Sequence, residues 1–484
     1  MGLIFSCFFL LPAFADEPSD EELRAEMVES VEDLRRTEDL TATAIRARKD
    51  KRGWLFDYGS NFSSNYSASD DNDRNPVAQD DPDHTWDHEI QLFGLVTTVD
   101  RNFKFYGRTK AKRTDNAKFK AGTKENDVQK PKIDMLYVER TFQGAALKSK
   151  LTFGRQFGKV GRGIAFGLTA DGILWNSKGK KMEATAMLLR QNPGDNNIDN
   201  FSPGSGRTKR MFFGLQVQHK FKKWLGLTVF SLWNKDRNSE ASYVTGAGQT
   251  QRSIFNSEYY GLGFDGTFFS SLNYWSEFIV VRGKTYNAAS ATNLTASKVG
   301  VDADAFDLGL RYLFGGDIAP TLFAEYAVGS GDADRGSNVT SSRAGSSFGK
   351  DSVFRSFGGL PMGHSLAPSL SNIRILKAGC SFKPFGRWGA ARWEDMTVNL
   401  TAYTYWAAAK GGPTSDPFIY PDRTGARKSL GSNDIGDEYD MTLSWKFFDD
   451  VNYQFKYGYF MPGPAYGSTR GREHTIKMKV SFDL

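Results

Sequence analysis

The chain has 484 residues, of which 39% are hydrophobic and 14% aromatic, with a formal net charge of +6 and a mean hydropathy of -0.48. After the N-terminus there is no apolar run of about eighteen residues, which excludes helical membrane spans. A membrane β-barrel is not excluded, because half of each barrel strand is polar. The 49 glycines and the many aromatic residues are typical of a large antiparallel barrel with tight turns and interfacial aromatic residues.

Residues 1–15 are predicted to be a secretory signal peptide, with an apolar core at 3–11 and a small-residue cleavage site at Ala13-Phe14-Ala15. The mature chain then keeps a single cysteine, Cys380, which excludes an internal disulfide and a cysteine-based metal site.

Residues 16–52 form a charged leader with apolar residues at helical spacing, which predicts a short N-terminal periplasmic helix. Two interpretations of residues 17–52 remain open. The segment is either a solvated leader or a helix that docks a periplasmic export partner or a second leader.

From residue 53 to residue 484 the sequence predicts short strands in which apolar and polar residues alternate. Side chains of a strand point alternately to opposite faces, so each such strand has one apolar and one polar face. The last strand, 473–484, is apolar at every even position from 476 and polar at every odd position from 475. We count eighteen strands, at 54–66, 85–98, 102–113, 132–143, 147–155, 170–175, 181–190, 208–219, 223–234, 255–269, 273–286, 301–314, 319–328, 371–383, 395–406, 434–447, 451–460 and 473–484.

The connections indicate a membrane barrel rather than a soluble sandwich. Those after odd-numbered strands are mostly long, such as 329–370 and 407–433, whereas those after even-numbered strands are mostly short, such as 100–101 and 270–271. Outer-membrane barrels have short periplasmic turns and long extracellular loops. The predicted fold is therefore all-β: a transmembrane antiparallel up-and-down β-barrel of about 18 strands, in contact with outer-membrane lipid.

Basic residues gather on one face of strand 102–113, namely Lys104, Arg108, Lys110 and Lys112. Because charges on a lipid face are costly, this row is expected to line the lumen. The same alternation places seven further cations inward: Arg210, Lys220, Arg311, Lys446, Lys456, Lys477 and Lys479. A cationic lining favours anions. Acidic residues also fall inward, so charge pairing across strands remains an alternative for each cation.

No catalytic set emerges, because the five histidines are scattered along the chain. The acidic run 70–83 lacks the ordered ligand spacing of a calcium site and is interpreted as a solvated outer loop. We therefore expect no enzymatic activity, no cofactor, no metal and no nucleic-acid partner.

Several segments, taken in order, resemble the bacterial alginate-export outer-membrane porin family. They are 134–140 with 151–156, Asp171-Gly172, 325–332 with 370–373, and 437–440 with 459–465. The resemblance implies an 18-stranded monomeric barrel that passes an anionic uronate polysaccharide through an arginine-lined constriction. Arg155, in the matching Gly-Arg-Gln, is the one residue it assigns to that constriction. Since Phe153 shares its alternation and looks outward, we expect a kink at Gly154 to turn Arg155 inward.

The leading functional hypothesis is an outer-membrane channel that passes anionic polysaccharide or other anionic solutes by selective diffusion, with the connection 329–370 as a gate or plug. The alternative is a general or small-solute porin with a mixed-charge lumen. An adhesin is suggested only by the long outer loops.

Overall fold

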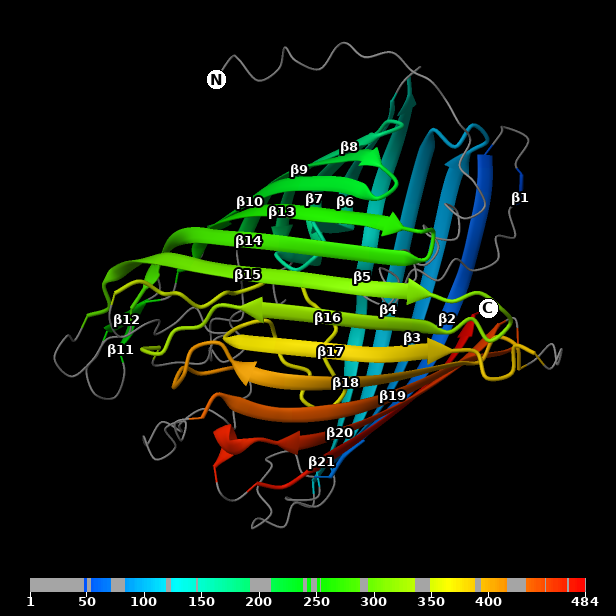
Figure 1. Ribbon diagram of the computed structural model, residues 1–484. Helices are drawn as coiled ribbons and strands as arrows, with labels where there is room; N and C mark the ends of the chain where they lie inside the picture. The colour runs from blue at the N-terminus through cyan, green and yellow to red at the C-terminus, as the bar shows by residue number, and fades with distance from the viewer. Residues whose placement is uncertain are drawn as a thin grey trace, which may run out of the picture.

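The computed structural model describes residues 48–49, 54–70, 83–118, 123–144, 147–191, 210–237, 242–244, 250–252, 254–287, 295–335, 349–387, 393–415, 432–448, 450–467 and 470–483 (Figure 1). The elements are β1 (Arg48–Lys49), β2 (Trp54–Ser69), β3 (Asp83–Thr98), β4 (Phe103–Lys118), β5 (Thr123–Gln143), β6 (Lys148–Val160), β7 (Phe166–Lys178), β8 (Met182–Gln191), β9 (Arg210–Lys222), β10 (Leu225–Asp236), β11 (Ser242–Val244), β12 (Thr250–Arg252), β13 (Asn256–Phe268), β14 (Leu272–Tyr286), β15 (Lys298–Leu313), β16 (Thr321–Gly329), β17 (Ile373–Phe382), β18 (Thr397–Ala407), β19 (Asp434–Phe448), β20 (Val451–Pro462), the 3-10 turn η2 (Pro464–Tyr466) and β21 (Glu473–Asp483).

The sheet closes on itself. Each long strand pairs with the next one in antiparallel fashion, and the last strand, β21, pairs with the first long strand, β2, from Asn61↔Asp483 to Ser69↔Thr475. Among the described residues, eighteen strands make up this closed wall. The prediction of a closed antiparallel 18-stranded barrel is thereby confirmed. The short hairpin β11–β12 belongs to the connection between β10 and β13.

The predicted helix within 17–52 lies outside the described residues, except for Arg48–Lys49, which form a short strand paired with β2. The predicted signal peptide also lies outside them. In the part of the chain that the structure describes, no helix is long and apolar enough to cross a membrane.

The wall has an apolar outer face because the alternation of the strands is kept through the register. Leu92, Phe278 and Leu310 remain 54%, 45% and 47% exposed although they lie in the middle of long strands. Their neighbours along the chain, such as Gln91 and Glu277, are buried on the inner face. Large exposed apolar side chains repeated around a barrel are what contact with lipid requires.

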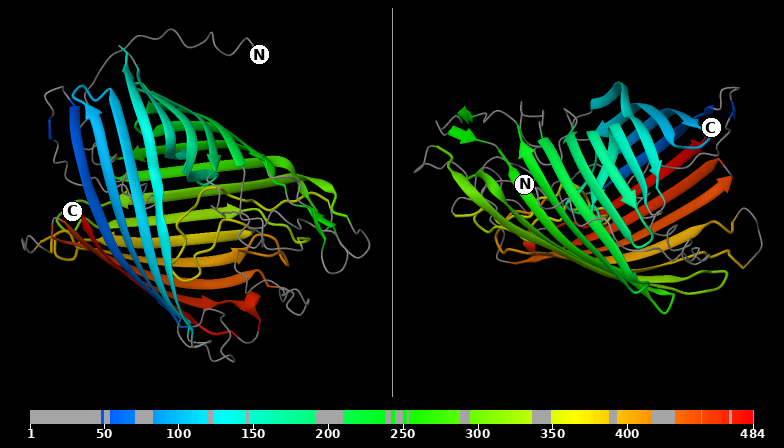
Figure 2. Two further views of the ribbon diagram at one scale, coloured as in Figure 1. Left: turned by 180° about the vertical axis from the view of Figure 1, so that it is seen from behind. Right: turned by 90° about the horizontal axis from the view of Figure 1, so that it is seen from above.

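Two segments fold into the lumen from the end of the barrel that bears the long connections. One is the tip of the β6–β7 hairpin, and the other is the connection between β16 and β17 (Figure 2). In that connection Phe357 packs against Phe212 of β9 and Tyr259 of β13, with ring centroids 4.8 and 6.0 Å apart. Tyr259 also donates a hydrogen bond to the carbonyl oxygen of Arg355 at 2.7 Å. The buried core of the protein therefore lies inside the barrel and narrows it.

Candidate functional site

The β6–β7 hairpin bends out of the wall into the lumen. β6 pairs with β5 only as far as residue 155, and β7 pairs with β8 only from residue 170. The two strands nevertheless stay paired with each other up to Val160↔Phe166. The hairpin tip, residues 156–169, has therefore left both neighbouring strands.

Two glycines that face each other, Gly154 and Gly172, allow this bend. Their φ angles are +123° and +157°. A Cβ atom would lie 2.2 Å from the carbonyl oxygen of Leu136 at the first position and 2.1 Å from that of Leu188 at the second. A side chain at either place would collide with the backbone of a neighbouring strand, so the bend requires glycine on both strands.

Arg155 does not point into the lumen as the sequence analysis expected. It lies directly opposite Leu136, and Leu136 and Phe153 are both exposed on the outer face. The bend at Gly154 redirects the strand but keeps the alternation, so Arg155 stays on the outer side. Its Nε donates to Oδ1 of Asp171 at 2.7 Å, and Nη1 donates to the carbonyl oxygen of Ile133 at 2.8 Å. This ion pair fastens the two strands where the hairpin turns.

Arg162, at the hairpin tip, takes the place in the lumen that had been assigned to Arg155. Its backbone N–H donates to Oε2 of Glu277 at 2.7 Å, and its Nε donates to Oδ2 of Asp307 at 3.0 Å. Its guanidinium group lies 4.5 Å from the ring centroid of Trp275. These partners belong to β14 and β15, so the tip reaches across the lumen. Arg162 lies between the predicted strands 147–155 and 170–175, so the alternation of strands gave no prediction for it.

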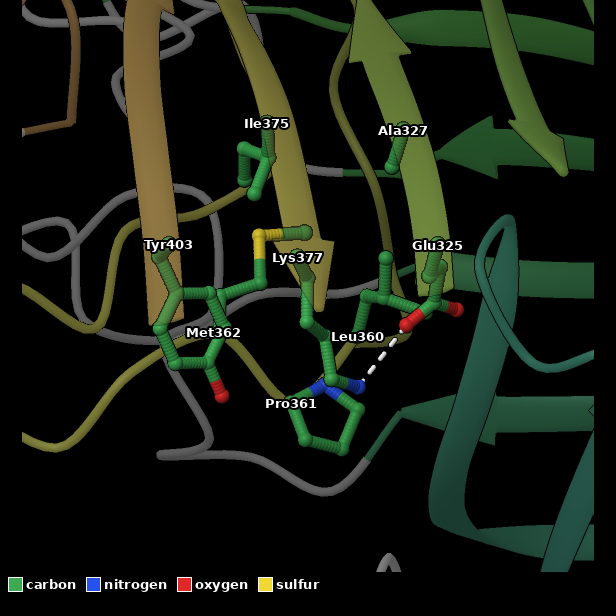
Figure 3. Close-up of a pocket in the computed structure, with 8 residues that line it drawn as sticks. All are labelled: Glu325, Ala327, Leu360, Pro361, Met362, Ile375, Lys377 and Tyr403. Atoms are coloured by element: carbon green, nitrogen blue, oxygen red, sulfur yellow. Dashed lines mark hydrogen bonds and ion pairs between the residues drawn. The ribbon is translucent and has the colours of Figure 1, made fainter. Parts of the chain in front are cut away.

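A second cation, Lys377 of β17, stands beside this cluster. Its Nζ lies 2.8 Å from Oε2 of Glu325 on β16, the strand next to it (Figure 3). Leu360, Pro361 and Met362 of the β16–β17 connection pack over this pair and leave a cavity of only about 10 Å³. The connection is therefore closely seated on the inner wall at this point.

The cations of this cluster are more accessible than the carboxylates that hold them. Arg162 is 27% exposed and Lys377 is 20% exposed. Asp307 is 0% exposed and Glu325 is 7% exposed. The constriction therefore presents positive groups to the aqueous path and keeps its acidic groups buried beneath them.

The basic row of β4 lies on the inner face, as the alternation indicates, but its members have acidic or aromatic partners. Lys104 lies 5.4 Å from the ring centroid of Tyr137. Arg108 forms an ion pair with Asp134, and Lys110 lies 3.5 Å from the same carboxylate. Lys112 lies 3.0 Å from a carboxylate oxygen of Asp87 on β3. The alternation placed these cations, but it did not reveal the carboxylates on neighbouring strands.

Arg210 and Arg311 differ in access to the lumen. Arg210 is 0% exposed, with Nη2 3.5 Å from Oδ2 of Asp236 and the guanidinium group 5.6 Å from the ring centroid of Phe357. It supports the folded-in connection and does not meet the aqueous path. Arg311 is partly exposed and lies 5.6 Å from the ring centroid of Trp275, the same ring that Arg162 contacts.

Three further candidate lysines lie on the inner face of β20 and β21. Lys456 is directly opposite Lys477, and Lys479 is directly opposite Gln454. The Nζ of Lys477 donates to the carbonyl oxygen of His364 at 2.7 Å. Lys477 therefore helps to hold the β16–β17 connection.

Glu438 of β19 is the main attachment point of that connection. It accepts hydrogen bonds from the backbone N–H groups of His364 and Ser365, each at 2.7 Å, and from the Tyr405 hydroxyl at 3.0 Å. Burial, together with the nearby charges of Lys456 and Lys477, lowers the pKa of His364 to about 4. The imidazole is thus neutral at physiological pH.

The family model described as alginate export matches residues 56–478. The chain belongs to the alginate export family. In this member of the family the Gly-Arg-Gln and Asp-Gly motifs form the two sides of the hairpin bend, with Arg155 and Asp171 as its ion pair. Among the described residues, no group of three or more acidic, histidine or cysteine side chains is placed to hold a metal ion.

Three solved structures from Pseudomonas aeruginosa have a similar fold. OccK5 (OpdH) is 12% identical with a TM-score of 0.51, OpdQ is 11% identical with 0.50, and OccK11 (OpdR) is 9% identical with 0.50. Each similarity covers 89% of this chain. It covers 98% of OccK5, 98% of OpdQ and 96% of OccK11. No curated protein matches the sequence. The family and the closed barrel together make this protein an outer-membrane channel of a bacterial cell.

Proposed function

We propose that the channel passes anionic polysaccharide of the uronate type, or other anionic solutes, by selective diffusion and without covalent chemistry. The support is the asymmetry at the constriction, where Arg162 and Lys377 are partly exposed while their partners Asp307 and Glu325 are buried. A carboxylate in transit meets a guanidinium or ammonium group first, and such contacts replace part of its hydration. The carboxylates beneath fix the cations in place, so little side-chain ordering is needed when an anion arrives.

The inner-face cations away from the constriction are proposed to extend this path. Lys104, Lys110 and Lys112 line the β3–β5 wall, and Lys456, Lys477 and Lys479 line the β20–β21 wall. Together they raise the local concentration of anions along both sides of the lumen.

A general porin with a mixed-charge lumen is the second candidate. The observation that favours it is that several lumenal cations are already ion-paired, including Arg108, Lys112, Arg162 and Lys377. Paired charges of both signs orient polar solutes without preferring one sign.

Flux into liposomes separates these two candidates. The channel is reconstituted, and uptake of a neutral disaccharide and of a diuronate of the same size is measured at low salt. The proposal predicts faster uptake of the diuronate, and inhibition of neutral-sugar uptake by longer uronate oligomers. Equal uptake without inhibition would favour the general porin.

We also propose that the channel works as a monomer and that residues 17–52 bind a periplasmic export partner. In a pull-down from envelope extracts, deletion of residues 17–50 is expected to remove that partner. An unchanged set of bound proteins, with unchanged export, would contradict this role.

A further inference from the structure

A lysine-rich recess lies on the inner wall near the end of the lumen that bears the long connections. It has a volume of about 300 Å³. Six residues of β3, β4 and β5 line it: Glu89, Lys110, Lys112, Gln129, Lys130 and Lys132. Four of the six are cationic and one is acidic, so the recess has a net positive charge. Its volume is at the lower end of the range of small-molecule sites.

The lysines of the recess are placed in a way that favours an anion. Lys110 of β4 is directly opposite Lys132 of β5, and like charges directly opposite each other destabilise a sheet. Lys110 lies 4.0 Å from Glu89 and Lys112 lies 3.0 Å from Asp87. In contrast, Lys130 and Lys132 are exposed and form no ion pair with any residue that the structure describes.

The recess exists because of the bent hairpin. β6 leaves the wall after Arg155, so β5 has a neighbouring strand on both sides only from Leu136 onward. Residues 123–135 of β5 pair with β4 alone, and the register shifts between Lys110 and Lys112. The absence of β6 at this level leaves open space beside Lys130 and Lys132. The recess is thus separate from the constriction at Arg162, which is formed by β14, β15 and the hairpin tip.

We infer that this recess is a binding subsite for the carboxylate groups of an anionic saccharide chain, distinct from the constriction. The inference rests on the proposed function and adds to it a binding site for the saccharide chain in the lumen. Residues two apart on a strand are separated by about 6.8 Å, so the lysine pairs on β4 and β5 can contact carboxylates of adjacent sugar units. Because Lys130 and Lys132 form no ion pair with a described residue, their ammonium groups bind an anion without first breaking such a pair.

Single-channel recording tests this subsite with a defined probe, a hexamer of uronate sugars added on the side of the long connections. Blocking events are compared for the wild type and the double variant K130Q/K132Q at 50 mM KCl. Removing two charge contacts is expected to shorten the mean block by about 25-fold, that is about fivefold for each contact. The matched control is K148Q/K178Q, which also removes two lysine charges, here from a directly opposed pair at the end of β6 and β7 far from the hairpin tip. A neutral hexasaccharide serves as the second control.

The outcomes separate the subsite from the proposed function. Shorter uronate blocks in K130Q/K132Q alone, with neutral-sugar events unchanged, support the subsite. Equal block durations in all three channels, with anion preference kept in a salt gradient, overturn the subsite and leave the proposed function standing. Cation preference of the wild type overturns both. Heat-modifiable migration on gels verifies that each variant is a folded barrel.

Discussion

Replacing Arg162 by glutamine removes the most accessible cation of the constriction and leaves its buried carboxylates in place. Asp307, which is 0% exposed, then loses its ion-pair partner. Two effects follow and have different readouts: the positive electrostatic field at the constriction becomes weaker, and the hairpin tip loses an attachment to the far wall.

The expected change in selectivity follows from Coulomb's law. Two unit charges 4 Å apart interact by about 1 kcal/mol in water and by about 4 kcal/mol at the effective dielectric constant of a protein surface. Even the smaller value corresponds to a factor of about five in a permeability ratio. We therefore expect R162Q to lower the chloride-to-potassium permeability ratio by at least about fivefold at low salt. The effect should shrink in 1 M salt, where the screening length is about 3 Å.

The hairpin tip also loses the ion pair of Arg162 with Asp307, one of its attachments to the far wall, while the backbone hydrogen bond of residue 162 to Glu277 is kept. Current noise should therefore rise in R162Q as the hairpin tip detaches. The double variant R162Q/D307N removes the cation and its buried partner together, so it should quieten the current and retain a permeability ratio below that of the wild type. An unchanged ratio in R162Q, measured by reversal potential on a folded channel at low salt, would refute the assignment of Arg162.

Four further predictions concern the hairpin bend and the folded-in connection. Gly172→Ala should prevent the inward bend and raise conductance or abolish assembly, whereas Gly94→Ala, with no atom within 4 Å of its Cβ, should change neither. Arg155→Gln should leave the permeability ratio unchanged, because the side chain lies on the outer face. It should increase the number of gating events, because the bend loses its ion pair with Asp171. A large loss of anion preference would contradict this placement of Arg155. Glu438→Gln should weaken the hydrogen bonds to the backbone N–H groups of His364 and Ser365 and so increase the frequency of full-conductance openings. The same frequency in the variant and the wild type would show that Glu438 does not keep the β16–β17 connection in place. The pKa of His364 is lowered to about 4, so docking of the connection should be strongest above pH 6.5 and should weaken as the pH falls from 6.5 to 4. The reason is that protonation of His364 adds a charge beside Lys456, Lys477 and Asp440. His364→Gln should remove this pH dependence in recordings across the same range.

The fold followed from the sequence because its determinants are local. Alternation defined each strand and its faces, and the difference between long and short connections defined the direction of each strand. Thus the closing strand 473–484 was expected to complete a barrel, and the structure pairs β21 with β2. The predicted bounds were less accurate where strands continue beyond the wall. β6 extends to Val160 and β7 begins at Phe166, whereas the predicted strands ended at 155 and began at 170.

The site followed only in part because its determinants are long-range. Alternation indicates that Arg108 faces inward, but not that Asp134 neutralises it. It cannot show that a turn such as 161–165 crosses the lumen to reach Asp307, which is more than 140 residues away. One signal was present: Gly154 and Gly172, each beside a charged residue, on two consecutive strands. Glycines that face each other at one level of a hairpin mark a place where the hairpin can leave the sheet.

The central claim is that the constriction presents cations while the acidic groups beneath them are buried, and reversal potential measures this most directly. The purified channel is placed in a planar bilayer with a tenfold KCl gradient, and the zero-current voltage is recorded. The account predicts a voltage of the sign set by chloride, and a shift toward zero as salt rises on both sides. A voltage of the sign set by potassium would contradict it.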